Sequence, residues 1–198
     1  MIWIKTAGPT RASPASSWPA SLPGPDQHKP KGSMMTDSIL EQRRIEAAFA
    51  KGIYEEMVAA LGVEQAKAIL ARAIVKLAKQ AAAEMAKESE SGPSLEHFVS
   101  LQPRWTKGNA LEIEVLRADA QHYDFNVKRC RYAEMYREMG LAELGAVLSC
   151  NRDGAFCEGY DPKLKLTRTQ TIMGGASHCD FRYRYEAGSG GPDGQGQA

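Results

Sequence analysis

The N-terminal half of the chain carries apolar side chains at the spacing of an α-helix. From residue 45 they recur at every fourth position, as Ile45, Phe49, Ile53 and Met57, and this recurrence predicts one helical face. Ser38-x-x-Glu41 is a capping-box pattern before this run, and Gly62 is a typical residue at a helix end. A second stripe predicts a helix over 64–87, with Ile69, Ala73, Leu77, Ala81 and Met85. We therefore predict an antiparallel helix pair joined at Gly62.

Strand-like alternation replaces the helical period after Trp105. Apolar and polar side chains alternate in four runs, over residues 111–116, 123–128, 164–173 and 181–185. The first two runs flank a turn around Asp119 and predict an antiparallel hairpin. Helical spacing returns in two short segments, over 132–139 and 141–148. The predicted fold class is α+β: an N-terminal helical hairpin packed with a small antiparallel four-stranded sheet and short helices.

The two ends of the chain differ in composition from this core. Residues 1–33 hold six of the ten prolines and show no periodicity. We therefore predict that 1–34 is a disordered leader or an over-extended start, with natural initiation at Met34 or Met35. Residues 188–198 contain five glycines in eleven positions and predict a flexible tail. The single predicted domain covers 35–187.

Charge and motif content exclude several classes of protein. The chain has 25 basic and 24 acidic residues, a net charge of +1, so it lacks the basic excess of a dedicated nucleic-acid binder. No stretch approaches the ~20 apolar residues of a membrane span, and no secretory signal is recognisable, so a cytoplasmic protein is expected. The chain has no G-x-G-x-x-G, P-loop or G-x-S-x-G motif. The expected partner is a small-molecule substrate, with no nucleic acid or membrane, and a homo-oligomer is possible.

Four cysteines lie in the C-terminal half, at 130, 150, 157 and 179. Without a secretory signal, reduced thiols are expected rather than a disulfide framework. The spacings match no paired C-x-x-C zinc pattern. A site made of Cys150, Cys157, His178 and Cys179 is conceivable, but free cysteines are commonly small buried side chains. We therefore predict no metal and no cofactor, and a structural role for Cys157.

Chemically reactive side chains are concentrated over 150–182, and their arrangement resembles a known family. The residues concerned are Cys130 with Tyr132-Ala133-Glu134, Cys150-x-x-Asp153, Arg168-Thr169 with Thr171, and Gly175-x-x-x-Cys179-Asp180-Phe181. Over about 125–183 this pattern resembles the L-2-amino-thiazoline-4-carboxylic acid hydrolase family. The resemblance implies opening of a sulfur-containing cyclic amidine by water, giving an N-carbamoyl-cysteine product. It leaves the actual ring substrate open.

Cys179 is the predicted nucleophile, because it follows the glycine turn and lies beside His178. An attacking thiolate is expected to have a lowered pKa and to be alkylated faster than the other thiols. Adjacent strand residues point to opposite faces, so His178 and Asp180 would face away from Cys179 unless the turn is irregular. They are nevertheless retained as substrate-binding candidates.

The remaining site candidates each have a structural alternative. Asp153 is predicted to transfer protons, or else to cap a helix over 154–158. Arg168 is predicted to hold a substrate carboxylate, or else to pair across strands with Asp180 or a glutamate. Cys150 is a second catalytic candidate, or else a packed core residue.

Two reaction routes and two other classes of protein remain open. Either Cys179 attacks the ring and Asp153 relays the proton, or a carboxylate activates water while Cys179 only lines the pocket. The competing class is a non-enzymatic sensor module that holds a small molecule or a metal through Cys150, His178 and Cys179. A structural partner of another hydrolase subunit is a third class, suggested by the alanine-rich helix pair.

Overall fold

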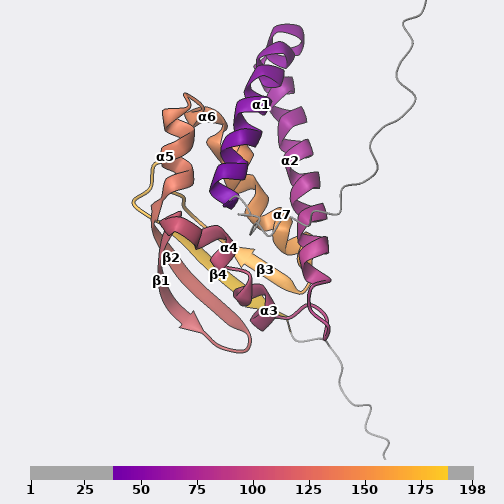
Figure 1. Cartoon of the computed structure of the whole chain (residues 1–198), viewed down its shortest axis with the longest axis vertical. Coiled ribbons are helices and arrows are strands. Elements are labelled where there is room, and N and C mark those ends of the chain that lie inside the picture. Colours follow the sequence, from indigo (N-terminus) through magenta and orange to yellow (C-terminus); the bar gives the residue numbers. More distant parts are fainter. Residues whose placement is uncertain (1–37, 187–198) are drawn as a thin grey trace, which may run out of the picture. The chain divides into compact units, whose positions relative to one another are not determined.

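The computed structural model describes residues 38–186 and begins with a long helical hairpin (Figure 1). Its two helices are α1 (Ile39–Leu61) and α2 (Val63–Ala86). The Ser38 hydroxyl accepts the Glu41 N–H at 3.2 Å, which satisfies one free donor at the start of α1. Gly62 joins the helices with φ +80°, a backbone conformation that favours glycine. The predicted hairpin is therefore confirmed. The predicted leader 1–34 and tail 188–198 lie outside the described residues.

Short helices follow the hairpin and recur between the strands. They are α3 (Leu95–Ser100), α4 (Pro103–Thr106), the 3₁₀ turn η1 (Lys107–Asn109), α5 (Arg131–Glu138), α6 (Ala142–Gly145), the π-helical turn η2 (Ala146–Cys150) and α7 (Asn151–Tyr160). The Ser94 hydroxyl caps α3 by accepting the His97 N–H at 3.1 Å. The η2 turn continues directly into α7, so Cys150 stands at the junction of two helical geometries.

The four strands form one antiparallel sheet in the order β1-β2-β4-β3. Their bounds are β1 Leu111–Ala118, β2 His122–Cys130, β3 Leu164–Thr167 and β4 Cys179–Tyr185. In the register, Val127 of β2 is opposite Cys179 of β4, and Phe125 is opposite Phe181. The α+β class and the four-stranded antiparallel sheet are confirmed.

The third predicted strand is shorter than expected, because β3 ends at Thr167 rather than near residue 173. The Asp180 carboxylate accepts the backbone N–H groups of Thr169 and Gln170 at 2.8 to 3.1 Å. A side chain therefore takes the donors that would otherwise continue the ladder. The chain leaves the sheet here and forms the loop that ends at β4.

The helical stripes predicted from the period are not the buried faces. On α1, Ile45, Phe49 and Ile53 are exposed, and Phe49 keeps 74% of its surface, whereas Ala47 is buried. On α2, the buried positions lie one residue beyond the predicted ones, at Ala66, Leu70, Ile74, Ala78 and Ala82. Small side chains let a neighbouring helix approach closely, and they therefore decide which side of each helix is covered.

Helix α7 makes this close approach to α2 (Figure 1). A Cβ added at Gly159 would lie 2.5 Å from the Cα and the carbonyl oxygen of Lys79, so only glycine fits this contact. Cys157, on the same helix, is buried in the core with Tyr160 and Leu164. This placement agrees with the structural role predicted for Cys157.

Candidate functional site

A cavity of about 960 Å³ lies between one face of the sheet and the helices packed against it. Strands β2 and β4 provide one wall, helices α1, α2 and α7 provide another, and α3 and α4 contribute to its border. Eight aromatic side chains contribute to the lining: Phe98, Trp105, Tyr123, Phe125, Tyr132, Phe156, Phe181 and Tyr183. A cavity of this size that combines aromatic walls with polar and charged groups is typical of a site for a small organic molecule.

Four predicted site residues line this cavity, although they come from three separate segments: Cys150, Asp153, Arg168 and Cys179. Arg168 donates from Nη1 to Asp153 Oδ2 in a short charged contact, and from Nη2 to the Cys150 carbonyl at 3.1 Å. Its guanidinium also lies 5.2 Å from the centre of the Phe181 ring. The loop after β3 thus holds Arg168 against the first turn of α7.

The Arg168–Asp153 pair excludes the structural alternatives that the sequence left open for these two residues. Asp153 is not a helix cap, because α7 begins at Asn151 and the Asp153 carboxylate binds Arg168 instead. Arg168 does not pair with Asp180 across the strands, because Asp180 is engaged by the loop backbone. Both structural alternatives were therefore wrong. Arg168 can pair with Asp153 because the chain leaves the sheet immediately after Thr167 and Arg168 can then reach α7.

Asp153 is a carboxylate held in a largely enclosed environment. Burial raises the pKa of Asp153 above its ordinary value, and the charge and hydrogen bond of Arg168 oppose that rise. The side chain still keeps 32% of its surface accessible. Asp153 is therefore a carboxylate with a perturbed pKa whose side chain is still accessible from the cavity.

Cys179 is buried, and its sulfur is held in place by the loop. The Ile172 N–H donates to Cys179 Sγ at 3.2 Å. Burial raises the pKa of Cys179, while the Ile172 N–H and the Arg168 cation oppose the rise. The predicted lowering of this pKa was therefore wrong, because the thiol lies in an apolar wall rather than beside an uncompensated cation. Its proton must be removed during any attack.

The other thiols of the cavity are also protonated at neutral pH. Burial raises the pKa of Cys150 to about 12 and that of Cys130 to about 11. Each of these shifts includes a contribution from the charge of Cys179, so the three sulfurs influence one another. Cys150 lines the cavity and is partly accessible, so it is not a fully packed core residue.

His178 and Asp180 do not line this cavity, in keeping with strand alternation around Cys179. His178 contacts the Gln170 side chain at 3.1 Å and the Ser177 hydroxyl at 3.0 Å. Burial tends to raise the pKa of Asp180, but hydrogen bonds from Thr169 and Gln170 outweigh it and lower that pKa. These contacts make Asp180 a residue that shapes the loop. A substrate-binding role for either residue stays a prediction.

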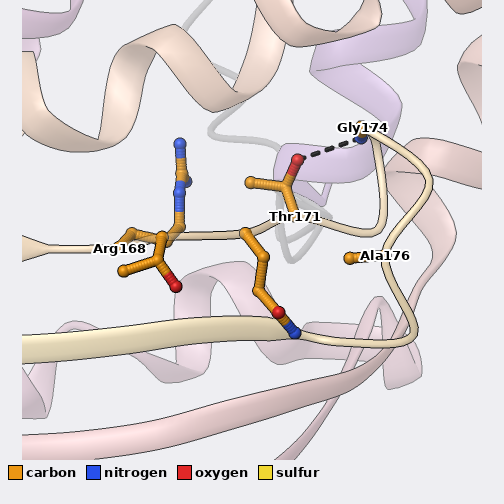
Figure 2. A pocket seen from close by; sticks show the side chains of 6 residues that line it. Arg168, Thr171, Gly174 and Ala176 are labelled. Carbon is orange, nitrogen blue, oxygen red and sulfur yellow. Dashed lines mark hydrogen bonds between the residues drawn. The ribbon is translucent and has the colours of Figure 1, made fainter.

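The loop between β3 and β4 also borders a smaller hollow of about 370 Å³. Figure 2 shows the six residues that line this hollow: Arg168, Thr169, Gln170, Thr171, Gly174 and Ala176. The Gly174 N–H donates to the Thr171 hydroxyl at 3.0 Å and closes the turn (Figure 2). Arg168 borders both spaces, so the loop conformation determines where its guanidinium lies.

Six further charged or thiol side chains in the cavity wall were not among the predicted site residues: Arg43, Glu46, Arg104, Lys107, Cys130 and Arg152. The sequence could have identified Cys130 as a site residue, since it belongs to the motif that carries the family resemblance. The sequence contains no such indication for Arg43 and Glu46, because charged residues on an amphipathic helix usually face solvent. Only the packing of α1 against the α7 side of the fold reveals them.

Two other observations concern metal and membrane. Within residues 38–186, no cluster of three or more His, Cys, Asp or Glu side chains is placed to hold a metal ion. None of the helices in this part of the chain has both the length and the apolar character needed to cross a membrane.

The fold and the site together define an α+β protein with a cavity that presents thiols and a carboxylate–guanidinium pair. The chain belongs to the L-2-amino-thiazoline-4-carboxylic acid hydrolase family, whose model matches residues 42–183. This match extends the resemblance seen over 125–183 into both long helices. No curated protein matches the chain.

Two solved structures are similar to it at low identity. One is the phenol-responsive sensory domain of the transcription activator PoxR with phenol, at 18% identity and a TM-score of 0.45, covering 70% of this chain and 73% of that one. The other is a trafficking protein particle complex subunit 3 from Naegleria fowleri covalently bound to palmitic acid. It has 10% identity and a TM-score of 0.44, and the match covers 74% of this chain and 96% of that one.

Proposed function

We propose that this protein is a hydrolase that opens a small cyclic amidine or amide in this cavity. One observation carries the proposal: Asp153, Arg168, Cys150 and Cys179, which the sequence separates, line one cavity. Membership of a family described as L-2-amino-thiazoline-4-carboxylic acid hydrolase supports this reaction class. The aromatic lining supports it as well, because a planar ring of small size can pack against such walls.

In the proposed reaction, Cys179 Sγ attacks the amidine carbon of the ring. Its proton passes to Asp153 or to the ring nitrogen as the S–C bond forms. The ring C–S bond then breaks and the leaving sulfur takes a proton, which leaves an isothiourea joined to Cys179. Water adds to that carbon, and cleavage of the bond to Cys179 releases a ureido product and restores the thiol. One water is consumed for each ring opened.

The surroundings of the thiol support this route in a specific way. Because burial raises the pKa of Cys179, the resting group is a thiol and a base is needed at the moment of attack. Asp153 is the acidic side chain of the cavity wall that shares Arg168 with the Cys179 environment. Arg168 would then hold Asp153 in position and stabilise its charge.

The direct-water route uses the same residues differently. There, Asp153 activates a water molecule that attacks the ring carbon, and Cys179 only packs against the substrate. Both routes require Asp153, and only the covalent route requires the sulfur of Cys179. Replacement of the sulfur therefore separates them.

The test is a screen of cyclic amidines and amides with purified protein, measuring free thiol and ureido product together. A ring C–S opening should release the two in equal amounts. Cys179→Ala should lose on the order of 10²-fold or more in kcat if the covalent route operates. Mass spectrometry of quenched protein should then show an adduct on the Cys179 peptide. Near-normal turnover by Cys179→Ala, with an inactive Asp153→Asn, would establish the direct-water route instead.

A ligand-binding sensor module is the second candidate function. The observation in its favour is that all three cavity thiols have raised pKa values in a lining that contains eight aromatic side chains. Such a wall can hold an apolar ligand without reacting with it. Binding of ring compounds with no product formed, and no adduct at any cysteine, would favour the sensor over the hydrolase.

A further inference from the structure

Two arginines and one glutamate form a second charged group in the cavity wall, apart from the Asp153–Arg168 pair. Arg43 Nη1 donates to both carboxylate oxygens of Glu46 at 2.7 Å, and Arg152 Nη2 donates to Glu46 Oε2 at 2.9 Å. All three residues line the cavity. The two guanidinium groups and the single carboxylate leave one positive charge, whereas Arg168 and Asp153 neutralise each other.

The arginines of this group are held in place and partly enclosed. Arg152 keeps 12% and Arg43 keeps 17% of their side-chain surfaces accessible. Arg152 is also anchored through Nε, which donates to the Leu148 carbonyl at 2.7 Å. A charge held with little water around it interacts more strongly with an anionic ligand than an exposed charge does.

Arg43 retains free donors for such a ligand. Among the described residues it gives hydrogen bonds through Nη1 alone, so Nε and Nη2 remain for a carboxylate. Arg43 and Arg152 also act on the proposed acid–base group, because their charges both lower the pKa of Asp153. Arg152 and Asp153 are consecutive residues of α7.

We infer that Arg43 and Arg152 form the carboxylate-binding pole of the cavity and select ring substrates that carry an anionic group. This inference rests on the proposed function for the identity of the ring, but the anion site itself can be measured without turnover. The sequence suggests Arg168 as the carboxylate ligand. In the structure that guanidinium already has an anionic partner in Asp153, whereas the group of Arg43, Arg152 and Glu46 carries one unbalanced positive charge.

The experiment measures binding of two saturated rings by calorimetry with the full chain. The probes are thiazolidine-4-carboxylate and thiazolidine, neither of which has an amidine carbon to attack. Wild type should bind the carboxylate more tightly. Arg43→Gln should weaken carboxylate binding about 10-fold or more, as loss of a charge-assisted pair does, and leave thiazolidine binding within about 2-fold. Arg43→Lys should restore part of the loss, and Glu46→Gln should strengthen carboxylate binding.

Arg44→Gln is the matched control, because Arg44 is the neighbouring arginine of α1 and lies outside the cavity wall. It should bind both probes as wild type does. Equal binding of the two probes by wild type, or equal effects of Arg43→Gln and Arg44→Gln, would overturn the inference. A selective loss with Arg168→Lys, and none with Arg43→Gln, would move the anion site to Arg168. If no amidine is ever opened but Arg43→Gln still removes the preference, the hydrolase proposal fails and the anion site stands.

Discussion

At the scale of single residues, the chemistry of the cavity depends on how each thiol is solvated. Cys179 has a backbone N–H donor and a nearby cation, both of which favour a thiolate, yet burial outweighs them. Cysteine reactivity follows the thiolate fraction. The Cys179 thiol should therefore be unreactive in the resting protein and should become a nucleophile only when a base removes its proton.

We accordingly predict that alkylation of Cys179 by iodoacetamide accelerates with pH up to and beyond pH 9. The reason is that its pKa is raised above the ordinary thiol value of 9.0. Peptide mass spectrometry after timed quenching gives the rate at each cysteine, and a bound cyclic amidine should protect Cys179. Cys157 is the internal control, because it is buried in the core and should stay unmodified while the protein is folded. A titration midpoint below pH 8.5 at Cys179 would contradict this account.

At the scale of elements, the contact between α2 and α7 depends on the absence of one side chain. We predict that Gly159→Ala destabilises the protein by about 1–3 kcal/mol, because its Cβ would overlap the Lys79 backbone, which cannot easily move. Gly154→Ala on the same helix is the matched control, since nothing lies within 4 Å of an added Cβ there. It should be neutral, or stabilising by up to about 1 kcal/mol through helix propensity. Urea denaturation of both variants measures the difference, and equal effects would refute the close approach.

The two long helices allow a similar comparison between an exposed apolar position on α1 and a buried one on α2. We predict that Phe49→Ala changes the free energy of unfolding by no more than about 0.5 kcal/mol, because Phe49 is largely exposed. Leu70→Ala on α2 should cost about 2–5 kcal/mol, because Leu70 is buried in the cluster that joins α1, α2 and α5. Chemical denaturation distinguishes them. A large loss at Phe49 would show that the exposed stripe is covered in solution.

At the scale of the whole molecule, several weak acids share one response to pH. Burial raises the pKa of Cys130 to about 11, and those of Cys150, Cys157 and Tyr136 to about 12. The folded protein thus holds protons that the unfolded chain releases at lower pH. This contribution to stability is fully present below the unfolded pKa values, near 9 for thiols. It is lost as the pH rises toward the folded values.

We therefore predict that the melting temperature falls progressively between about pH 8.5 and pH 11. Each thiol that ionises only in the unfolded chain should contribute a slope approaching 1.4 kcal/mol per pH unit. A Cys130→Ala and Cys150→Ala double variant should show a shallower decline, whatever its starting stability. Thermal denaturation monitored by circular dichroism over this range measures the slopes. Parallel slopes for wild type and the double variant would argue against burial of these thiols.

The sequence by itself determined much of the local structure and the family to which the chain belongs. The capping pattern at Ser38, the break at Gly62 and the strand alternation around Asp119 depend on neighbours along the chain, and the structure bears them out. The motifs between Cys130 and Phe181 indicated the family from the residue types and their spacing. Local periodicity and spacing are enough for these conclusions, because helices, turns and strand faces follow from short-range geometry.

Only the tertiary structure decided which apolar face is buried and which charges meet. The period alone could not show that α1 exposes Phe49, because burial depends on where a partner helix can approach, and here Ala47 provides that place. Nor could it place Arg43 and Arg152 on a common glutamate, or join Arg168 to Asp153. A long side chain binds whatever the fold brings within reach, so its partner is a property of packing across segments rather than of its own neighbours in the chain.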